Sequence, residues 1–267
     1  MEPILFGCAF LAYLIASALN IVYLGLKKKA LTNTALVIMV IGFILHTIAL
    51  ILRTIAAKHA PFANLYESLV FFSWTTILTY FILEFKYKLK ILGAFVPPIA
   101  FLTIGYASVL PKSYKTAEPL VPALQSYWLE IHVIACFVAY FVFAVAFVMG
   151  IIFLIRARKE TEKLPTLEVL DDLSYKTIAI GFPFLTLGII TGAIWANYAW
   201  GSYWSWDPKE TWALVIWLIY AAYLHARVTG GWRGKRTNYL NILGFMAVIF
   251  TYLGVNLLLS DMHSYAK

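Results

Sequence analysis

The chain has 267 residues, of which 62% are hydrophobic and 13% are charged, and its mean hydropathy is +0.81. This composition excludes a soluble domain of this length and indicates a polytopic membrane protein. The net charge of +8 is compatible with nucleic-acid binding, but the basic residues lie in short connections between apolar segments, as orientation signals do. We therefore expect the lipid bilayer, and no nucleic acid, as a partner.

Eight apolar segments of about 20 residues, the length needed to cross a bilayer, follow one another along the chain. They predict an all-α bundle of about eight transmembrane helices that forms one domain over residues 1–267. The spans are expected at 3–26, 33–56, 66–84, 91–109, 128–155, 176–195, 208–227 and 239–259. Pro97 and Pro98 should kink the fourth helix or mark a late start, and Pro183 should kink the sixth. The connection 156–176 carries charges of both signs and is expected to be amphipathic or solvated.

Lysine and arginine are distributed unequally between the two sets of connections. Fifteen lie in one set: Lys27, Lys28, Lys29, Lys86, Lys88, Lys90, Arg156, Arg158, Lys159, Lys163, Lys176, Arg227, Arg233, Lys235 and Arg236. Six lie in the other: Arg53, Lys58, Lys112, Lys115, Lys209 and Lys267. The positive-inside rule makes the first set cytoplasmic, so both termini and the connection 195–207 face outward. We expect the bacterial plasma membrane, with a thylakoid membrane as the alternative.

The two cysteines, Cys8 and Cys136, lie inside apolar segments and form no CxxC pair. Neither a thiol–disulfide function nor a cysteine-based metal site is therefore expected. Cys136 follows His132 by four residues, on the same helical face, and the expected role is that of a small buried core residue. No basic segment precedes the first apolar run, so no cleaved signal peptide is expected.

The segment WANYAWGSYWSWDPKETW, from Trp195 to Trp212, holds five of the nine tryptophans. Tryptophan is usual in the aromatic belts at a membrane surface, but a belt places only a few at each helix end. Five in one connection favour a binding surface, a broad apolar platform with indole N–H donors at its edges. Such a platform suits a large planar ligand.

Asp207, Pro208 and Glu210 have the residue types and spacing of a capping box at the start of the seventh helix. Lys209 could pair with an anionic group of the ligand, or lie in solvent or against lipid. Arg53, at the outer end of the second helix, could likewise serve an anionic group or extend its side chain to the membrane surface.

Histidines supply the means to hold a metal at the centre of a planar ligand. His132 and His263 lie near the outer surface, His46 and His225 lie within spans, and His59 lies in an outer loop. One histidine on an apolar helix usually bonds a neighbouring carbonyl or hydroxyl, yet ionisable groups inside a membrane often mark functional sites. Haem fits the arrangement, because it is flat, apolar on its faces, anionic at its propionates and commonly ligated by imidazole.

Three segments resemble one known family. WGSYWSWDPKETW is similar to the tryptophan-rich WWD signature of the haem-handling proteins of cytochrome c assembly, and it continues into WLIYAAYLHAR as in the CcsA (ResC) branch. APFANLYESLVFF, at 60–72, and NLLLSDMHSY, at 256–265, are similar to the outer-loop and terminal histidine motifs of that branch. The resemblance covers nearly the whole chain.

The resemblance implies a subunit of the System II cytochrome c synthase. CcsA-type proteins work with a CcsB/ResB-type membrane protein, carry haem b to the outer face and present its vinyl groups to the reduced thiols of CxxCH in apocytochrome c. Thiol-reducing proteins contribute indirectly. Because the chain lacks a large outer domain of the CcsB kind, a separate partner is needed.

The resemblance also assigns residues. It implies that His132 and His263 are axial iron ligands at the outer surface, and that His46 and His225 form the pair that first receives haem. The remaining cofactor-binding residues are expected to be Trp200, Trp204, Trp206 and Asp207. No catalytic acid or base is assigned, because the contribution would be proximity and orientation.

Three alternatives remain at this point. A CcmC-like haem-delivery protein would have the same loop but fewer spans and no inner pair. A non-enzymatic exporter or regulator would not need the intact WWD loop. An electron carrier with permanent haem would need two histidines facing each other at fixed depths in a four-helix bundle.

Overall fold

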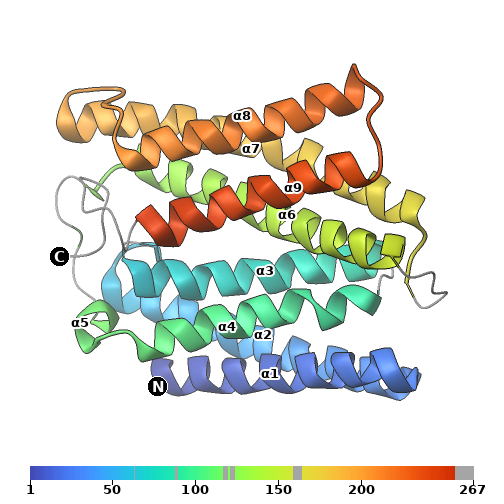
Figure 1. Ribbon diagram of the computed structural model, residues 1–267. Helices are drawn as coiled ribbons and strands as arrows, with labels where there is room; N and C mark the ends of the chain where they lie inside the picture. The colour runs from blue at the N-terminus through green and yellow to red at the C-terminus, as the bar shows by residue number, and fades with distance from the viewer. Residues whose placement is uncertain (63, 88–89, 117–119, 121–123, 159–163, 256–267) are drawn as a thin grey trace. The chain divides into compact units, whose positions relative to one another are not determined.

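A computed structural model describes the chain except residues 63, 88–89, 117–119, 121–123, 159–163 and 256–267. The described part consists of helices and their connections, without a strand (Figure 1). Within it, eight helical segments are long and apolar enough to cross a membrane. The predicted all-α polytopic fold is therefore confirmed.

Residues Met1–Val121 form the first of two compact units. Its elements are α1 (Glu2–Leu26), α2 (Lys29–Ala57), α3 (Leu65–Tyr87), the 3-10 turn η1 (Lys90–Ala94), α4 (Val96–Val109) and the short α5 (Lys112–Lys115). α1 packs along α2 and α4, and α3 packs along α4. Gly42 permits the close approach of α2 to α1, since a Cβ there would lie 2.7 Å from the Cβ of Ala12.

Arg53 ties together one end of this first unit. Its side chain is buried, and its Nε donates to Glu67 Oε1 at 2.9 Å. Its two terminal nitrogens donate to the carbonyl oxygens of Lys115, at 2.6 Å, and Thr116, at 3.1 Å. The guanidinium thus joins α2, α3 and α5 inside the unit, so the expectation that it extends to the membrane surface is wrong. Hydrogen-bond partners for every nitrogen offset the cost of removing the charge from water.

Residues Pro122–Lys267 form the second unit. Its helices are α6 (Tyr127–Arg158), α7 (Leu167–Trp200), α8 (Pro208–Val228) and α9 (Lys235–Ile249), and α9 continues into the π-helical turn η3 (Phe250–Gly254). α6 packs along α7 over most of its length, and α9 packs on α6 and α8. The core between these helices includes Phe143, Ile178, Ile216, Tyr220 and Phe245.

Asp171 joins three helices at one end of the second unit. Its Oδ2 accepts a hydrogen bond from the buried Arg227 of α8. Its Oδ1 accepts from the backbone N–H of Gly234, at 3.0 Å, and from the hydroxyl of Thr237, at 3.3 Å, where α9 begins. The carboxylate is therefore saturated with donors from the connection between α8 and α9 and fixes that connection against α7.

All eight predicted spans occur, and most of their ends differ by a few residues. The largest difference is the start of the sixth span, expected at 176, whereas α7 begins at Leu167. Asp171 is buried and paired, and the acidic residues Glu168, Asp171 and Asp172 lie in the first turns of α7 rather than in a connection. The late start of the fourth span is confirmed, since Pro97 and Pro98 lie in the first turn of α4. α7 is one helix that includes Pro183.

Candidate functional site

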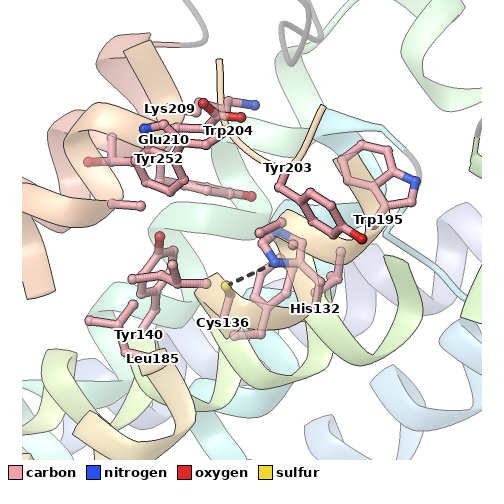
Figure 2. A pocket seen from close by; sticks show the side chains of 17 residues that line it. His132, Cys136, Tyr140, Leu185, Trp195, Tyr203, Trp204, Lys209, Glu210 and Tyr252 are labelled. Atoms are coloured by element: carbon pink, nitrogen blue, oxygen red, sulfur yellow. Dashed lines mark hydrogen bonds between the residues drawn. The ribbon is translucent and has the colours of Figure 1, made fainter. Parts of the chain in front are cut away.

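A cavity of about 160 Å³ lies in the second unit, at the end where α6 begins and α7 ends. Figure 2 shows His132 and Cys136 of α6 on one side and Trp204, Lys209 and Tyr252 across from them. The lining is therefore largely apolar and aromatic, with a few polar groups, as is usual for a small-molecule site. The site joins His132 to the tryptophan-rich loop, as the sequence predicts.

His132 is held by α7. Its Nδ1 lies 2.7 Å from the carbonyl oxygen of Gly188, and its ring is nearly parallel to that of Trp195, with centroids 6.4 Å apart. A carbonyl only accepts, so Nδ1 carries a proton, and in the neutral form of the ring the lone pair is on Nε2. Metal-binding histidines are commonly fixed in this way, with one ring nitrogen bonded to a carbonyl and the other available to the metal.

The tryptophans of the loop differ in their roles. Trp195 and Trp204 line the cavity. Trp200 packs against Trp195 with ring centroids 4.8 Å apart, and Trp212 packs against an aromatic ring of η3 at 4.4 Å. Trp206 is 68% exposed and lies edge-on to Trp204 at 5.7 Å. Two of the rings thus form the cavity wall, Trp200 supports Trp195, Trp212 joins α8 to η3, and Trp206 extends the aromatic surface outward.

The predicted capping box is present at the start of α8. The carboxylate of Asp207 accepts from the backbone N–H of Glu210 at 2.7 Å, and Glu210 Oε2 accepts from the backbone N–H of Asp207 at 3.4 Å. The same Glu210 oxygen accepts from the N–H of Ser205 at 2.7 Å. Between Ser205 and Asp207, Trp206 has a φ of 60°, in the left-handed region that non-glycine residues rarely adopt. The cap therefore fixes the shape of the loop that carries Trp204 and Trp206.

His46 and His225 have opposite surroundings in their respective units. His46, in the first unit, is 0% exposed, and its Nδ1 lies 3.2 Å from the hydroxyl of Tyr13. Within the described residues its Nε2 has no hydrogen-bond partner, although the backbone of Val70 lies close to the ring. His225, in the second unit, is exposed on α8, and its Nδ1 lies 3.4 Å from the hydroxyl of Thr229.

His59 does not line the described cavity. It follows the end of α2, with Nδ1 2.9 Å from the carbonyl oxygen of Ala60 and 3.9 Å from the carboxylate of Glu67. These contacts agree with a loop residue. His263 lies outside the described residues.

Several residues of the site were not found by sequence reasoning. Cys136 was expected in the core but is half-buried and lines the cavity, because it lies one turn along α6 from His132. Its Sγ is 3.7 Å from His132 Nδ1. Gly188 and Gly192 of α7 were also missed, although small residues four apart are the usual signal for close packing of membrane helices.

The sequence model of the family described as Cytochrome C assembly protein matches residues 62–263. The chain belongs to this family. It is 42% identical to the cytochrome c biogenesis protein CcsA of Guillardia theta, with 91% of this chain and 90% of the relative covered. The CcsA of Prochlorococcus marinus is 40% identical, with 99% and 95% covered, and that of Chlamydomonas reinhardtii is 44% identical, with 86% and 67% covered. This member of the family is of the CcsA type, and its role lies in cytochrome c assembly.

A solved structure supports the fold of this CcsA-type protein. The cytochrome c haem lyase CcmF matches it with a TM-score of 0.73 over 94% of this chain, at 17% sequence identity. The match covers 46% of CcmF, so the chain spans about half the length of that protein. An identity this low shows a shared fold and carries no residue roles.

Proposed function

We propose that this protein binds haem b and presents it at the outer membrane face for thioether attachment to the CxxCH motif of apocytochrome c. It would act as a subunit of a cytochrome c synthase with a CcsB/ResB-type membrane protein, and would also bring haem across the membrane. The observation that carries the proposal is the cavity in which His132, bonded to the Gly188 carbonyl through Nδ1, lies beside the aromatic wall of Trp195 and Trp204.

The chemistry of the cavity suits haem. His132 would ligate the iron through Nε2, and His263 would be the second axial ligand. The cavity is smaller than the roughly 300–1,000 Å³ that usually encloses a small-molecule ligand, so it would cover only part of the macrocycle. The exposed rings of Tyr203 and Trp206 would lie against the rest and leave an edge open to the substrate protein. Lys209, which lines the cavity, would attract a propionate.

The residues would act by holding the reactants in place. In the attachment step each cysteine thiol adds across a vinyl double bond, so that a C–S bond forms and the thiol proton ends on the other vinyl carbon. The step needs reduced thiols, and thiol-reducing proteins would contribute indirectly by supplying them. No side chain of the site has to transfer a proton. Trp200, Trp204 and Trp206 would orient the ring, while Asp207 maintains their loop through the cap. Proximity of this kind can supply much of the rate enhancement.

We also propose, from the family resemblance, that His46 and His225 ligate haem before it reaches the outer site. His225 supports this because its imidazole is exposed on α8. Within the described residues, Nε2 of His46 has no hydrogen-bond partner, but Tyr13 and Phe6 pack against the imidazole. The ring centroids of Phe6 and His46 are 5.4 Å apart. Ligation at His46 would therefore require these two rings to move.

The proposed location follows the relatives and the charge pattern. The excess of basic residues on one set of connections supports a bacterial plasma membrane, with both termini and the tryptophan-rich loop outside. Relatives from plastids and cyanobacteria support the thylakoid membrane as the alternative.

Two alternative functions are a CcmC-like haem-delivery protein and a non-enzymatic haem exporter or regulator. The eight spans and the CcsA relatives favour the synthase subunit over both.

The test is the spectrum of reduced haem in the full chain purified with a CcsB-type partner. We expect His132→Ala and His263→Ala to lose or alter haem ligation, and added imidazole to restore the signal. His46→Ala and His225→Ala should lower haem loading, whereas His59→Ala, the matched control, should not. Unchanged haem in all four ligand variants would contradict the assignment. A haem that never exchanges with imidazole would indicate a permanent electron carrier instead.

A further inference from the structure

We infer that Gly188 and Gly192 of α7 are positioning residues for His132, an inference that rests on the proposed haem-binding function. Gly188 supplies the carbonyl that fixes which imidazole nitrogen is protonated. Gly192 leaves the space that the imidazole ring occupies. Together they would set the direction in which Nε2 of His132 points.

The spacing between α6 and α7 leaves no room for a side chain at these positions. A Cβ on Gly192 would lie 2.5 Å from Nδ1 and 2.8 Å from Cε1 of His132. A Cβ on Gly188 would lie 2.5 Å from Sγ of Cys136. All three distances are well below van der Waals contact, so α6 and α7 can pack this closely only because these residues are glycines.

A third glycine contacts α6 away from the cavity. A Cβ on Gly181 would lie 2.7 Å from the Cε1 atom of Phe143. Phe143 belongs to the apolar core of the second unit and does not line the cavity. Gly181 therefore offers a substitution that disturbs the same helix pair by a similar clash without touching His132.

The Gly188 carbonyl is a rigid acceptor because it belongs to the backbone of α7, which is helical from Leu167 to Trp200. It accepts from His132 Nδ1 at 2.7 Å and from the hydroxyl of Thr191 at 3.2 Å. An acceptor on Nδ1 keeps the proton there and makes Nε2 a stronger electron donor to a metal. Loss of this bond should therefore weaken ligation and favour ferrous over ferric iron.

The imidazole has no simple way to accommodate a methyl group on Gly192. The ring of Trp195 lies beside it in a nearly parallel orientation, and the methyl group would occupy the position next to Nδ1. The ring must rotate or the two helices must separate. Either movement breaks the bond from Nδ1 to the Gly188 carbonyl.

The experiment compares Gly192→Ala with Gly181→Ala in the full chain purified with its CcsB-type partner and bound haem. We expect Gly192→Ala to bind haem about 10- to 100-fold more weakly, the usual effect of losing such a supporting contact. Its reduced spectrum should match that of His132→Ala and return with added imidazole. The haem that remains should have a raised midpoint potential. Gly181→Ala should keep the wild-type spectrum and potential even where its thermal stability falls.

A second pair of variants keeps the test decisive if Gly192→Ala does not fold. Gly188→Ala should lose His132 ligation because its methyl group meets the Cys136 sulfur, and the double variant with Cys136→Ala should regain it. A wild-type spectrum in Gly192→Ala, equal damage in Gly181→Ala, or no recovery in the double variant would overturn the inference. If His132→Ala binds haem with the wild-type spectrum, the proposed haem-binding function of His132 is contradicted. That result is distinguishable from a failure of the inference about the two glycines.

Discussion

Two adjacent aspartates near the start of α7 have opposite surroundings. Asp171 is 5% exposed, pairs with the buried Arg227 and accepts hydrogen bonds from the start of α9. Asp172 pairs with Lys176 at 2.7 Å, but both side chains are about half exposed. The same residue type, one position apart, should therefore differ greatly in its contribution to stability.

We expect Asp171→Asn to lower the free energy of unfolding by about 3–5 kcal/mol, because it leaves the Arg227 guanidinium buried without a counter-charge. Asp172→Asn should change it by less than about 1 kcal/mol, since an exposed ion pair contributes little. Thermal unfolding of the two variants in the same detergent measures the difference. Equal losses would mean that Asp171 has no special role in joining the helices.

At the level of residues, the capping box and the place of His132 beside the tryptophan-rich loop could be predicted, but the inner wall of the cavity could not. The spacing of Asp207 and Glu210 is enough to predict the capping box, because the cap is local. The cavity wall formed by Cys136 and Gly188 depends on the register between α6 and α7, which no local pattern specifies. His132 was found because histidine in an apolar helix is conspicuous, whereas glycine there is ordinary.

The helices themselves were predictable because twenty-residue apolar runs specify them. The ends of the helices were harder to predict where a charged residue is buried, as at the start of α7.

The hairpin of α1 and α2 contains a buried polar contact, since the Tyr13 hydroxyl bonds Nδ1 of the fully buried His46. In an apolar interface such a contact holds two helices in one register.

Tyr13→Phe is expected to lower the free energy of unfolding by about 1–3 kcal/mol, because the buried imidazole loses its hydrogen-bonding side chain. Tyr23→Phe is the control on the same helix, since the Tyr23 side chain is only half-buried. Thermal unfolding of both variants tests this. A Tyr13→Phe protein as stable as the control would show that the contact does not hold α1 against α2.

At the scale of the whole molecule, the unequal distribution of lysine and arginine predicts which end of the second unit faces outward. The cavity lies at the end where α7 meets α8, and Asp171 lies toward the other end of α7. The end that contains Asp171 is rich in basic residues, among them Arg227, Arg233 and Lys235. The cavity end should therefore face away from the cytoplasm.

This orientation can be measured with a membrane-impermeant thiol reagent on intact cells. Ser202→Cys, in the exposed loop after α7, should react from outside. Lys28→Cys, in the exposed connection between α1 and α2, should react only after the membrane is permeabilised. The unaltered chain corrects for Cys8 and Cys136. Reaction in the opposite order would place the cavity on the cytoplasmic side and remove the basis for thioether attachment outside.

The π-helical turn η3 takes up one residue more than a turn of α-helix. The turn widens to hold this residue, so the residues before and after it keep the faces that they would have in a regular α-helix. Deleting Leu253 should convert η3 to an ordinary turn with little effect on thermal stability, while Thr251 and Tyr252 keep their places at the cavity. Val255 would then keep its direction, because five residues of a π-helical turn and four residues of an α-helix rotate the chain by about the same angle. We therefore expect this variant to fold and to bind haem like the wild type, and a haem spectrum like that of His263→Ala would contradict this.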